Sequence, residues 1–339
     1  MGIGRGVGAI GAVLAVVGGA LAAGAGAWAA SELRFGHAGA PDDPVAVAAE
    51  RFKELVEAKT GGAVTVSLHP AGELGHPRSV LQGVALGNVD VAVAANPDVA
   101  TFEPAMGVLD LPFLFDSPAH AHAVLDGEIG RGVLEKLERH NLKGLALWEI
   151  GFHELTNAVR PVRAPADLAG LTISTTSNAA LAEAFRLLGA EPTPINADHL
   201  HPALATGAVD GQEGPVRAAY AGRLHEVQGH LSLTHHAYTV APLVMNLQRF
   251  GALPSEQRRA ILEAAQEAGD DLRRLNAELD AEALEAMRRA GVEVVEDPDI
   301  AAFRDAVAAA ARAAYAAEHG DDVLARIDRL RTTRAAAGR

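Results

Sequence analysis

Two polar side chains with the chemistry of a binding site, Gln212 and Glu213, lie in the stretch VDGQEGP, which runs from Val209 to Pro215. An amide and a carboxylate together can donate and accept hydrogen bonds, and a carboxylate can also hold a cation. Glycine, glutamine, glutamate and proline in this order fit neither a regular strand nor a regular helix. The stretch is therefore either a plain loop or the rim of a site.

Histidines are the second group that could do chemistry, because the chain has fourteen of them. His199 and His201 are separated by one residue, and His235 and His236 are adjacent. A zinc site needs three or four converging ligands, whereas neighbouring residues of a strand point to opposite faces. We therefore predict no metal site and no cofactor.

Catalytic groups are not arranged in a recognisable motif. The sequence contains no G-x-S-x-G nucleophile elbow. Two carboxylate pairs, Glu149 with Glu154 and Asp98 with Glu103, lie in stretches read as polar loops, where solvated charge is the ordinary explanation. We predict a binding protein without catalytic residues, and a secreted α/β enzyme is the competing class.

Length and composition narrow the class further. The 339 residues are enough for two domains, each with a core of its own. A net charge of −14 and an aromatic content of 4% argue against a nucleic-acid binder. The chain has no cysteine, so disulfides and thiol nucleophiles are excluded and an oxidising compartment is tolerated.

Residues 1–30 form a segment unlike the rest of the chain. Arg5 provides an early positive charge, a long run of apolar and small residues follows, and Ala27-Trp28-Ala29 has the small-x-small pattern of a cleavage site. We predict a cleaved signal peptide and a periplasmic mature protein. The alternative is a retained membrane anchor, since the apolar run is long enough to span a bilayer.

Strand-like and helix-like segments alternate after residue 30. Helical spacing of apolar residues predicts a helix over PVAVAAERFKELVEAK, which begins at Pro44 and is followed by Gly61 and Gly62. LRFGH, AVTVSLH and VDVAVAA read as strands before and after it, and LKGLALWE and AGLTIST as later strands. Helices are expected at 179–188, 255–290 and 299–334. This alternation predicts an α/β fold with parallel strands and crossover helices.

Several stretches together resemble one family. They are LRFGH, AAERFKELVEAKTGG, GELG, GVLDLPFLF, LKGLALWEIGF, LTN, RPVRAPADLAGL, LGAEPTPI, ALATGAVDGQEGP and HEVQGHLSLTHHAY. In this order they are similar to the periplasmic solute-binding proteins of tripartite ATP-independent periplasmic (TRAP) transporters, of the DctP type. They cover most of residues 33–246, and beyond Asn246 only length and helical character agree.

The resemblance implies a two-lobed periplasmic-binding-protein fold with mixed and parallel sheets, a central cleft and long C-terminal helices. Residues 31–152 would form mainly lobe 1, 153–246 mainly lobe 2, and 247–339 helices that pack on both. Such a protein closes over one small solute and delivers it to a membrane permease. It would be a monomer, or a dimer that pairs through the helix at 255–290.

The chain departs from this family at three positions that usually face the ligand. The family's GLxIR strand reads Gly170-Leu171-Thr172-Ile173-Ser174 here, so Ser174 replaces the arginine that would fork a carboxylate. His153 replaces the arginine of GFR, and Gly214 replaces the asparagine of QENP. An organic acid held with the help of a protonated His153 is favoured slightly. A neutral or cationic solute, such as a polyol or an amine, is the alternative.

The candidate ligand-binding residues are polar groups near the expected cleft, with one tryptophan and one tyrosine. They are His37, Asn96, Trp148, His153, Ser174, Thr176, Asn178, Gln212, Glu213 and Tyr238. For Trp148 a place in the core is the alternative, and for Ser174 a solvent-facing strand position. The resemblance also leaves open a hard cation held by the oxygens of Gln212 and Glu213 and bridged to a ligand carboxylate.

Overall fold

The computed structural model describes residues 1–2, 31–176 and 178–337. The first half contains β1 (Ser31–Gly36), α1 (Pro44–Lys59), β2 (Val64–His69), α2 (Pro77–Leu86), β3 (Val91–Val93), α3 (Asn96–Ala100), the 3-10 helix η1 (Pro104–Asp110), α4 (Pro118–Leu125), α5 (Glu128–Glu135) and the 3-10 helix η2 (Lys136–His140). The predicted signal segment lies outside the described residues, apart from its first two.

The second half begins with a strand that the two halves share. It contains β4 (Leu142–Asn157), η3 (Pro165–Leu168), β5 (Thr172–Thr175), α6 (Ala179–Leu187), β6 (Glu191–Pro194), α7 (Ala197–Ala205), β7 (Gly211–Gly214), α8 (Val216–Ala221), η4 (Leu224–Glu226) and β8 (His230–Asn246). The chain ends with α9 (Leu247–Ala252), α10 (Ser255–Arg289), β9 (Glu293–Val295), α11 (Ile300–His319) and α12 (Asp322–Ala337).

Helix α1 shows how local sequence sets these elements. The Asp43 carboxylate accepts a hydrogen bond of 2.8 Å from the Val45 N–H, and Pro44 occupies the first turn. Apolar residues at helical spacing, among them Phe52 and Val56, are buried against the sheet. The helix ends where Gly61 adopts a positive φ of 59°.

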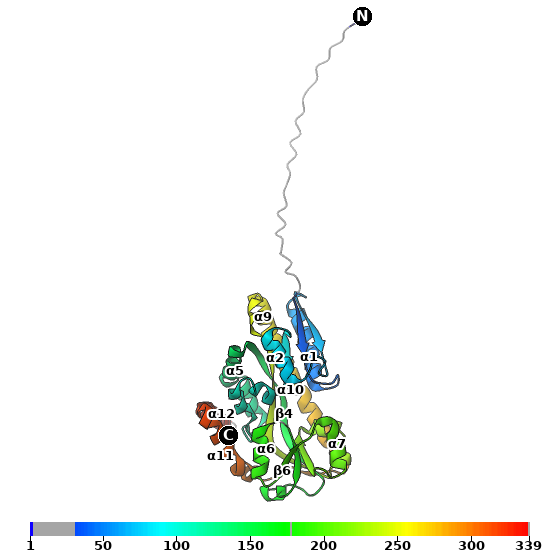
Figure 1. Ribbon diagram of the computed structural model, residues 1–339, viewed down its shortest axis with the longest axis vertical. Coiled ribbons are helices and arrows are strands. Elements are labelled where there is room, and N and C mark those ends of the chain that lie inside the picture. Colours follow the sequence, from blue (N-terminus) through cyan, green and yellow to red (C-terminus); the bar gives the residue numbers. More distant parts are fainter. Residues whose placement is uncertain (3–30, 177, 338–339) are drawn as a thin grey trace.

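The strands of the described residues form one mixed sheet of nine strands, in the order β2-β1-β3-β8-β4-β7-β5-β6, with β9 beside β8. Strands β4 and β8 are long, pair with each other in antiparallel orientation, and extend from one end of the molecule to the other. In Figure 1, α1, α2, α5 and α9 lie at one end and α6, α7 and β6 at the other, with β4 between them. We call the end built on β1–β3 lobe 1 and the end built on β5–β7 lobe 2.

Each lobe has an apolar cluster on both faces of the sheet. Lobe 1 packs β1 and β3 against α1 and α10 on one face and against α2, α4 and α5 on the other. Lobe 2 packs β5 against α6 and α11, and its other cluster joins α7, α8 and α10. The two-lobed α/β fold predicted from the sequence is confirmed, while the lobe boundaries at 152/153 and 246/247 stay a prediction.

Helix α10 spans both lobes. Its first half packs on α1, where Lys59 Nζ donates to Glu267 Oε1 at 2.7 Å, and its last turns bury Ala283 and Met287 in lobe 2. The apolar face of α10 is therefore used within its own chain. Within the residues that the structure describes, no helix is both long and apolar enough to span a membrane.

Candidate functional site

Three neighbouring strands of lobe 2 bring several predicted site residues together. Gln212 of β7 pairs with Ser174 of β5 on one side and with Thr156 of β4 on the other. Glu213 lies opposite Leu155, close to His153 of β4. Ser174, Gln212 and Glu213 lie at or near the carboxyl ends of the parallel strands β5 and β7, the edge at which open α/β sheets bind ligands.

The Glu213 carboxylate is the charged centre of this region, and its side chain is fully buried. One oxygen contacts His153 Nδ1 and lies 3.6 Å from His236 Nε2, and the other accepts a hydrogen bond of 2.9 Å from the Thr176 N–H. We call Glu213, His153, His236 and Thr176 the Glu213 cluster. Burial alone would raise the pKa of Glu213, but the two imidazoles outweigh it and hold the pKa below its usual range.

Both imidazoles of the cluster are fixed at their second nitrogen. His153 Nε2 lies 2.9 Å from the Thr239 hydroxyl, and His236 Nδ1 lies 2.7 Å from the Thr234 hydroxyl. Gln212, next to the cluster, donates from Nε2 to the Thr156 hydroxyl at 3.1 Å. The hydrogen bonds thus hold the cluster in one arrangement, in which one carboxylate faces two imidazole rings.

Lobe 1 contributes two buried polar side chains beyond the carboxyl ends of its strands. His37 follows β1 and Asn96 follows β3, and these strands are parallel neighbours. Asn96 is completely buried and donates from Nδ2 to the Met106 carbonyl at 2.9 Å. In the described part of the chain, Asn96 Oδ1 and His37 Nδ1 are buried without a hydrogen-bond partner. Burial lowers the pKa of His37, so its ring is neutral at pH 7.

Asn178 connects the two lobes. It caps α6 by accepting a hydrogen bond of 3.1 Å from the Leu181 N–H, and it donates from Nδ2 to the Asp110 carbonyl at 2.9 Å. Burial raises the pKa of the Asp110 carboxyl to about 7, against the opposing hydrogen bond from Asn96. Asp110 was missed in the sequence, although it lies in the stretch GVLDLPFLF that carries the family resemblance.

A cavity of about 730 Å³ is lined by residues of both lobes, but none of the predicted ligand-binding residues lines it. Asp43 and Val45 line it from the segment after β1, and Pro215 and Arg217 line it from the segment after β7. Helix α10 closes one side of it. Its size is that of a small-molecule site, for which about 300–1,000 Å³ is usual.

Trp148 lies in the core, and this corrects the prediction that it forms a wall of the site. Its side chain is completely buried against Phe35, and its indole N–H donates to the Ala265 carbonyl at 2.9 Å. A Cβ on Gly269 of α10 would approach the indole to 2.9 Å, so the helix packs directly on the ring. The core alternative for Trp148 is the one realised.

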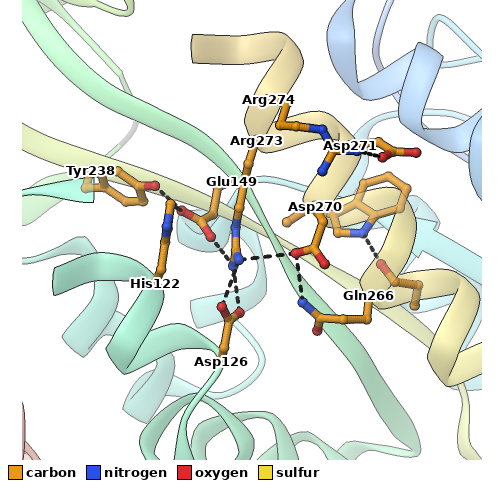
Figure 2. Close-up of polar contacts among 11 residues, drawn as sticks. His122, Asp126, Glu149, Tyr238, Gln266, Asp270, Asp271, Arg273 and Arg274 are labelled. Atoms are coloured by element: carbon orange, nitrogen blue, oxygen red, sulfur yellow. Dashed lines mark hydrogen bonds and ion pairs between the residues drawn. The ribbon is translucent and has the colours of Figure 1, made fainter. Parts of the chain in front are cut away.

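Tyr238 belongs to a second polar region, shown in Figure 2. Its hydroxyl donates to the carboxylate of Glu149, which is 2% exposed and is also paired with Arg273 of α10. Arg273 forms a two-bond fork to Asp126, with N···O distances of 2.7 and 2.8 Å, and His122 Nε2 lies 3.3 Å from Glu149. We call Arg273, Glu149, Asp126, Tyr238 and His122 the Arg273 cluster. Tyr238 is thus separated from the Glu213 cluster, and the sequence offered no signal for Arg273 beyond a charged helix face.

The acidic residues read as solvated pairs are mostly buried and paired, which is a further correction. Glu149 meets Arg273, Glu154 meets His235, and Glu103, whose side chain is fully buried, meets Arg139. The prediction of solvated carboxylates was wrong because the basic partners of these residues come from distant segments, or from positions that the pairing of two strands brings close. None of these carboxylates is left as a free pair for acid and base catalysis in the described residues.

The histidine pairs do not converge on one ion. His235 bonds Glu154, which raises the pKa of the ring against the effect of burial, while His236 contacts Glu213 on a different side. The described residues contain no group of three or more histidine, aspartate or glutamate side chains that could hold a metal. The oxygens of Glu213 are already engaged by two imidazoles and an N–H group.

The chain matches known proteins over nearly its whole described length. The family model for the bacterial extracellular solute-binding proteins of family 7 (DctP) matches residues 35–318. The 2,3-diketo-L-gulonate-binding periplasmic protein YiaO of Escherichia coli is 38% identical over 304 residues, covering 89% of this chain and 93% of that protein.

Solved structures agree with this match. A TRAP periplasmic solute-binding protein from Ochrobactrum anthropi has a TM-score of 0.85 and 34% identity, with 90% of this chain and 97% of that chain covered. One from Polaromonas, bound to D-erythronate, has a TM-score of 0.79 and 33% identity, with 88% and 98% covered. These are solute-binding proteins and not enzymes, as the sequence predicted for this chain. The chain belongs to the DctP family of TRAP periplasmic solute-binding proteins.

Proposed function

We propose that this protein captures a small polyhydroxylated organic acid between its lobes, in the periplasm, and delivers it to the membrane permease of a TRAP transporter. The observation that carries the proposal is the set of buried polar groups at the carboxyl ends of the strands: in the part of the chain that the structure describes, Glu213 lies with two imidazoles in lobe 2, and His37 and Asn96 have unpaired atoms in lobe 1. Ligands of open α/β folds bind at this edge, and a site formed by two lobes couples binding to their closure.

The lobe 1 side of the junction supports a hydroxylated solute. Asn96 Oδ1 is a hydrogen-bond acceptor and His37 Nδ1 a donor or acceptor, and both are buried without a partner in the described residues. An unpaired buried polar group is costly, so a hydroxyl that reaches either atom gains more than it would in water. The E. coli relative, named for 2,3-diketo-L-gulonate, and the Polaromonas protein, bound to D-erythronate, are consistent with acids that carry several hydroxyls.

The acid group needs a positive field that Ser174 does not supply. The Glu213 cluster sets the imidazoles of His153 and His236 beside one carboxylate. These rings are the basic groups at the strand ends where the arginine is absent. We therefore expect the acid group to lie beside them, and Ser174→Arg to supply the fixed charge that forks a carboxylate.

A neutral or cationic solute is the second candidate, and one contact favours it. Glu213 bonds His153 directly, so this imidazole is already paired with a carboxylate of the protein and is less available to a ligand carboxylate. A polyol would then bind through the same hydroxyl contacts at His37 and Asn96.

A thermal-shift series with matched solutes tests both candidates. D-erythronate and erythritol differ at the acid group and share hydroxyls, and an amine of similar size completes the set. We expect D-erythronate at a hundred times its dissociation constant to stabilise the protein by about 2.7 kcal/mol. Ser174→Arg should strengthen acid binding. Stabilisation by the polyol or the amine, without the acid, would instead establish the second candidate.

A further inference from the structure

The segment 111–115 sends its side chains into two different cores. Leu111, Leu114 and Phe115 are buried in the apolar cluster of lobe 1. Phe113 is 5% exposed and is buried in the cluster of lobe 2, with Leu168, Leu181, Phe185 and Phe303. One aromatic side chain of a lobe 1 segment is thus inserted into the other lobe.

The backbone of Phe113 explains this reversal of direction. Its φ is +53°, in the left-handed region that side chains other than glycine rarely adopt. Such a conformation is held only when its surroundings impose it, and strained residues of this kind cluster at functional positions. Here the Phe113 N–H donates to the His236 carbonyl of β8 at 2.9 Å, which fixes the peptide while the ring occupies lobe 2.

The residue that holds Phe113 is also a member of the Glu213 cluster. The His236 ring lies 3.6 Å from Glu213 and packs against Phe185, with ring centroids 5.3 Å apart. Phe113, His236 and Phe185 also line the same small void of about 10 Å³, so the Phe113 ring has little room to move. Asn178 of lobe 2 also bonds the carbonyl of Asp110. We call this contact between the lobes, formed by Phe113 with His236 and by Asp110 with Asn178, the seam.

We propose that Phe113 is a positioning residue that locks the seam between the lobes to His236, so that the Glu213 cluster is held in place for solute capture. This inference rests on the proposed function, because it assigns the Glu213 cluster to the solute site. A displacement of lobe 1 at this seam acts on the His236 peptide directly. Phe115, by comparison, packs in the apolar cluster of lobe 1 and edge-on against Tyr238 of the shared strand β8.

Amide hydrogen exchange without solute tests the positioning role by itself. Phe113→Leu is compared with Phe115→Leu, a matched loss of ring atoms from a buried phenylalanine of the same segment. We expect exchange at the Thr176 amide, which bonds Glu213, to become at least tenfold faster in Phe113→Leu and to stay within about twofold in Phe115→Leu. Phe113→Met, whose unbranched and flexible side chain can fill the outline of the ring better, replaces the leucine variant if that variant does not fold. Equal effects of the two substitutions, or no effect at Thr176, would overturn the proposal.

Binding of D-erythronate then separates this proposal from the proposed function. If the wild-type protein binds it, we expect at least a tenfold loss of affinity in Phe113→Leu and less than a threefold loss in Phe115→Leu. Equal losses would show that Phe113 acts only through core stability and would refute the positioning role. If the wild-type protein binds no acid of the series, the proposed solute class fails, while the exchange experiment still decides whether Phe113 positions the cluster.

Discussion

The Glu213 cluster and the Arg273 cluster each bury a carboxylate, but they pair it with different cations. Glu213 faces the imidazoles of His153 and His236, whereas Glu149 faces the guanidinium of Arg273 and the hydroxyl of Tyr238 (Figure 2). A guanidinium presents a planar fork of donors and stays charged, whereas an imidazole offers one nitrogen to each partner. Similar burial therefore gives one carboxylate whose main partner is a fixed charge that ties α10 to lobe 1, and one that is held by two rings at the strand ends of lobe 2.

Removing the guanidinium of Arg273 should have the largest effect on stability. Arg273→Met leaves Glu149 buried without its ion-pair partner, and breaking a buried pair in this way costs about 3–5 kcal/mol. Urea unfolding at pH 7 measures the change in the free energy of unfolding. Arg274→Met is the matched control, because Arg274 is the next residue, its side chain is 66% exposed, and its pair with Asp271 is worth little. Similar losses of stability in the two variants would show that the buried Arg273 cluster contributes no more to stability than an exposed ion pair.

Removing the charge of Glu213 should cost less. Glu213→Gln keeps one acceptor oxygen but replaces the other with an NH2 donor, so either His153 or the Thr176 N–H loses its acceptor, and we expect a loss of about 1–3 kcal/mol at pH 7. Because the pKa of Glu213 is lowered in the folded protein, its contribution is present above the unfolded value of 4.5 and declines as the pH falls further. Unfolding curves at pH 7 and pH 4 should show a smaller difference between wild type and variant at pH 4. The exposed Glu183→Gln serves as control, and a difference that grows towards acid pH would contradict the assignment.

Asp110 tests whether a carboxyl without a cation behaves in the opposite way. Its pKa is raised to about 7, so the folded protein binds a proton that the unfolded chain has already lost, and stability falls as the pH rises from about 4 to about 7. Asp110→Asn should therefore gain about 1 kcal/mol at pH 8 and change little at pH 4. Thermal unfolding at the two pH values checks this against the exposed control Asp42→Asn. A loss of stability at pH 8 would mean that the ionised carboxylate has a stabilising role.

The smallest effect is expected at His235, the imidazole that lies outside the Glu213 cluster. Glu154 raises its pKa in the folded protein, so its contribution is present below the unfolded value of 6.5 and is lost as the pH rises through the folded value. The side chain is 48% exposed, and solvent screening limits the effect of His235→Asn to about 0.5 kcal/mol at pH 6 and less at pH 8. Chemical unfolding at both values measures it. An effect as large as that of Glu213→Gln would show that the exposed pair of His235 with Glu154 is worth as much as the buried Glu213 cluster.

Local pattern was sufficient for the regular elements near the site. The apolar spacing after Pro44 and the following glycines predicted α1, because helix periodicity and helix ends depend on neighbouring residues. The ordered family stretches predicted the two-lobed fold. They also placed Ser174, Gln212 and Glu213 near one another, since these residues lie at or near the ends of strands that such a fold sets side by side.

Partners distant in the sequence decided the rest. Trp148 lies in the core because Gly269 of α10 lets the helix approach its ring. The pairing of β4 with β8 brings Tyr238 to Glu149, and α10 adds Arg273. The sequence by itself thus determined most elements, the fold and the strand-end residues of the candidate site. It did not show that VDGQEGP contains the buried strand β7, which is defined by pairing with β4 and β5, or that the helix expected at 299–334 is divided into α11 and α12. Only the tertiary structure decided which polar groups are paired, which rings are buried and why Phe113 points into the other lobe, because burial and charge pairing depend on contacts between segments far apart in the chain.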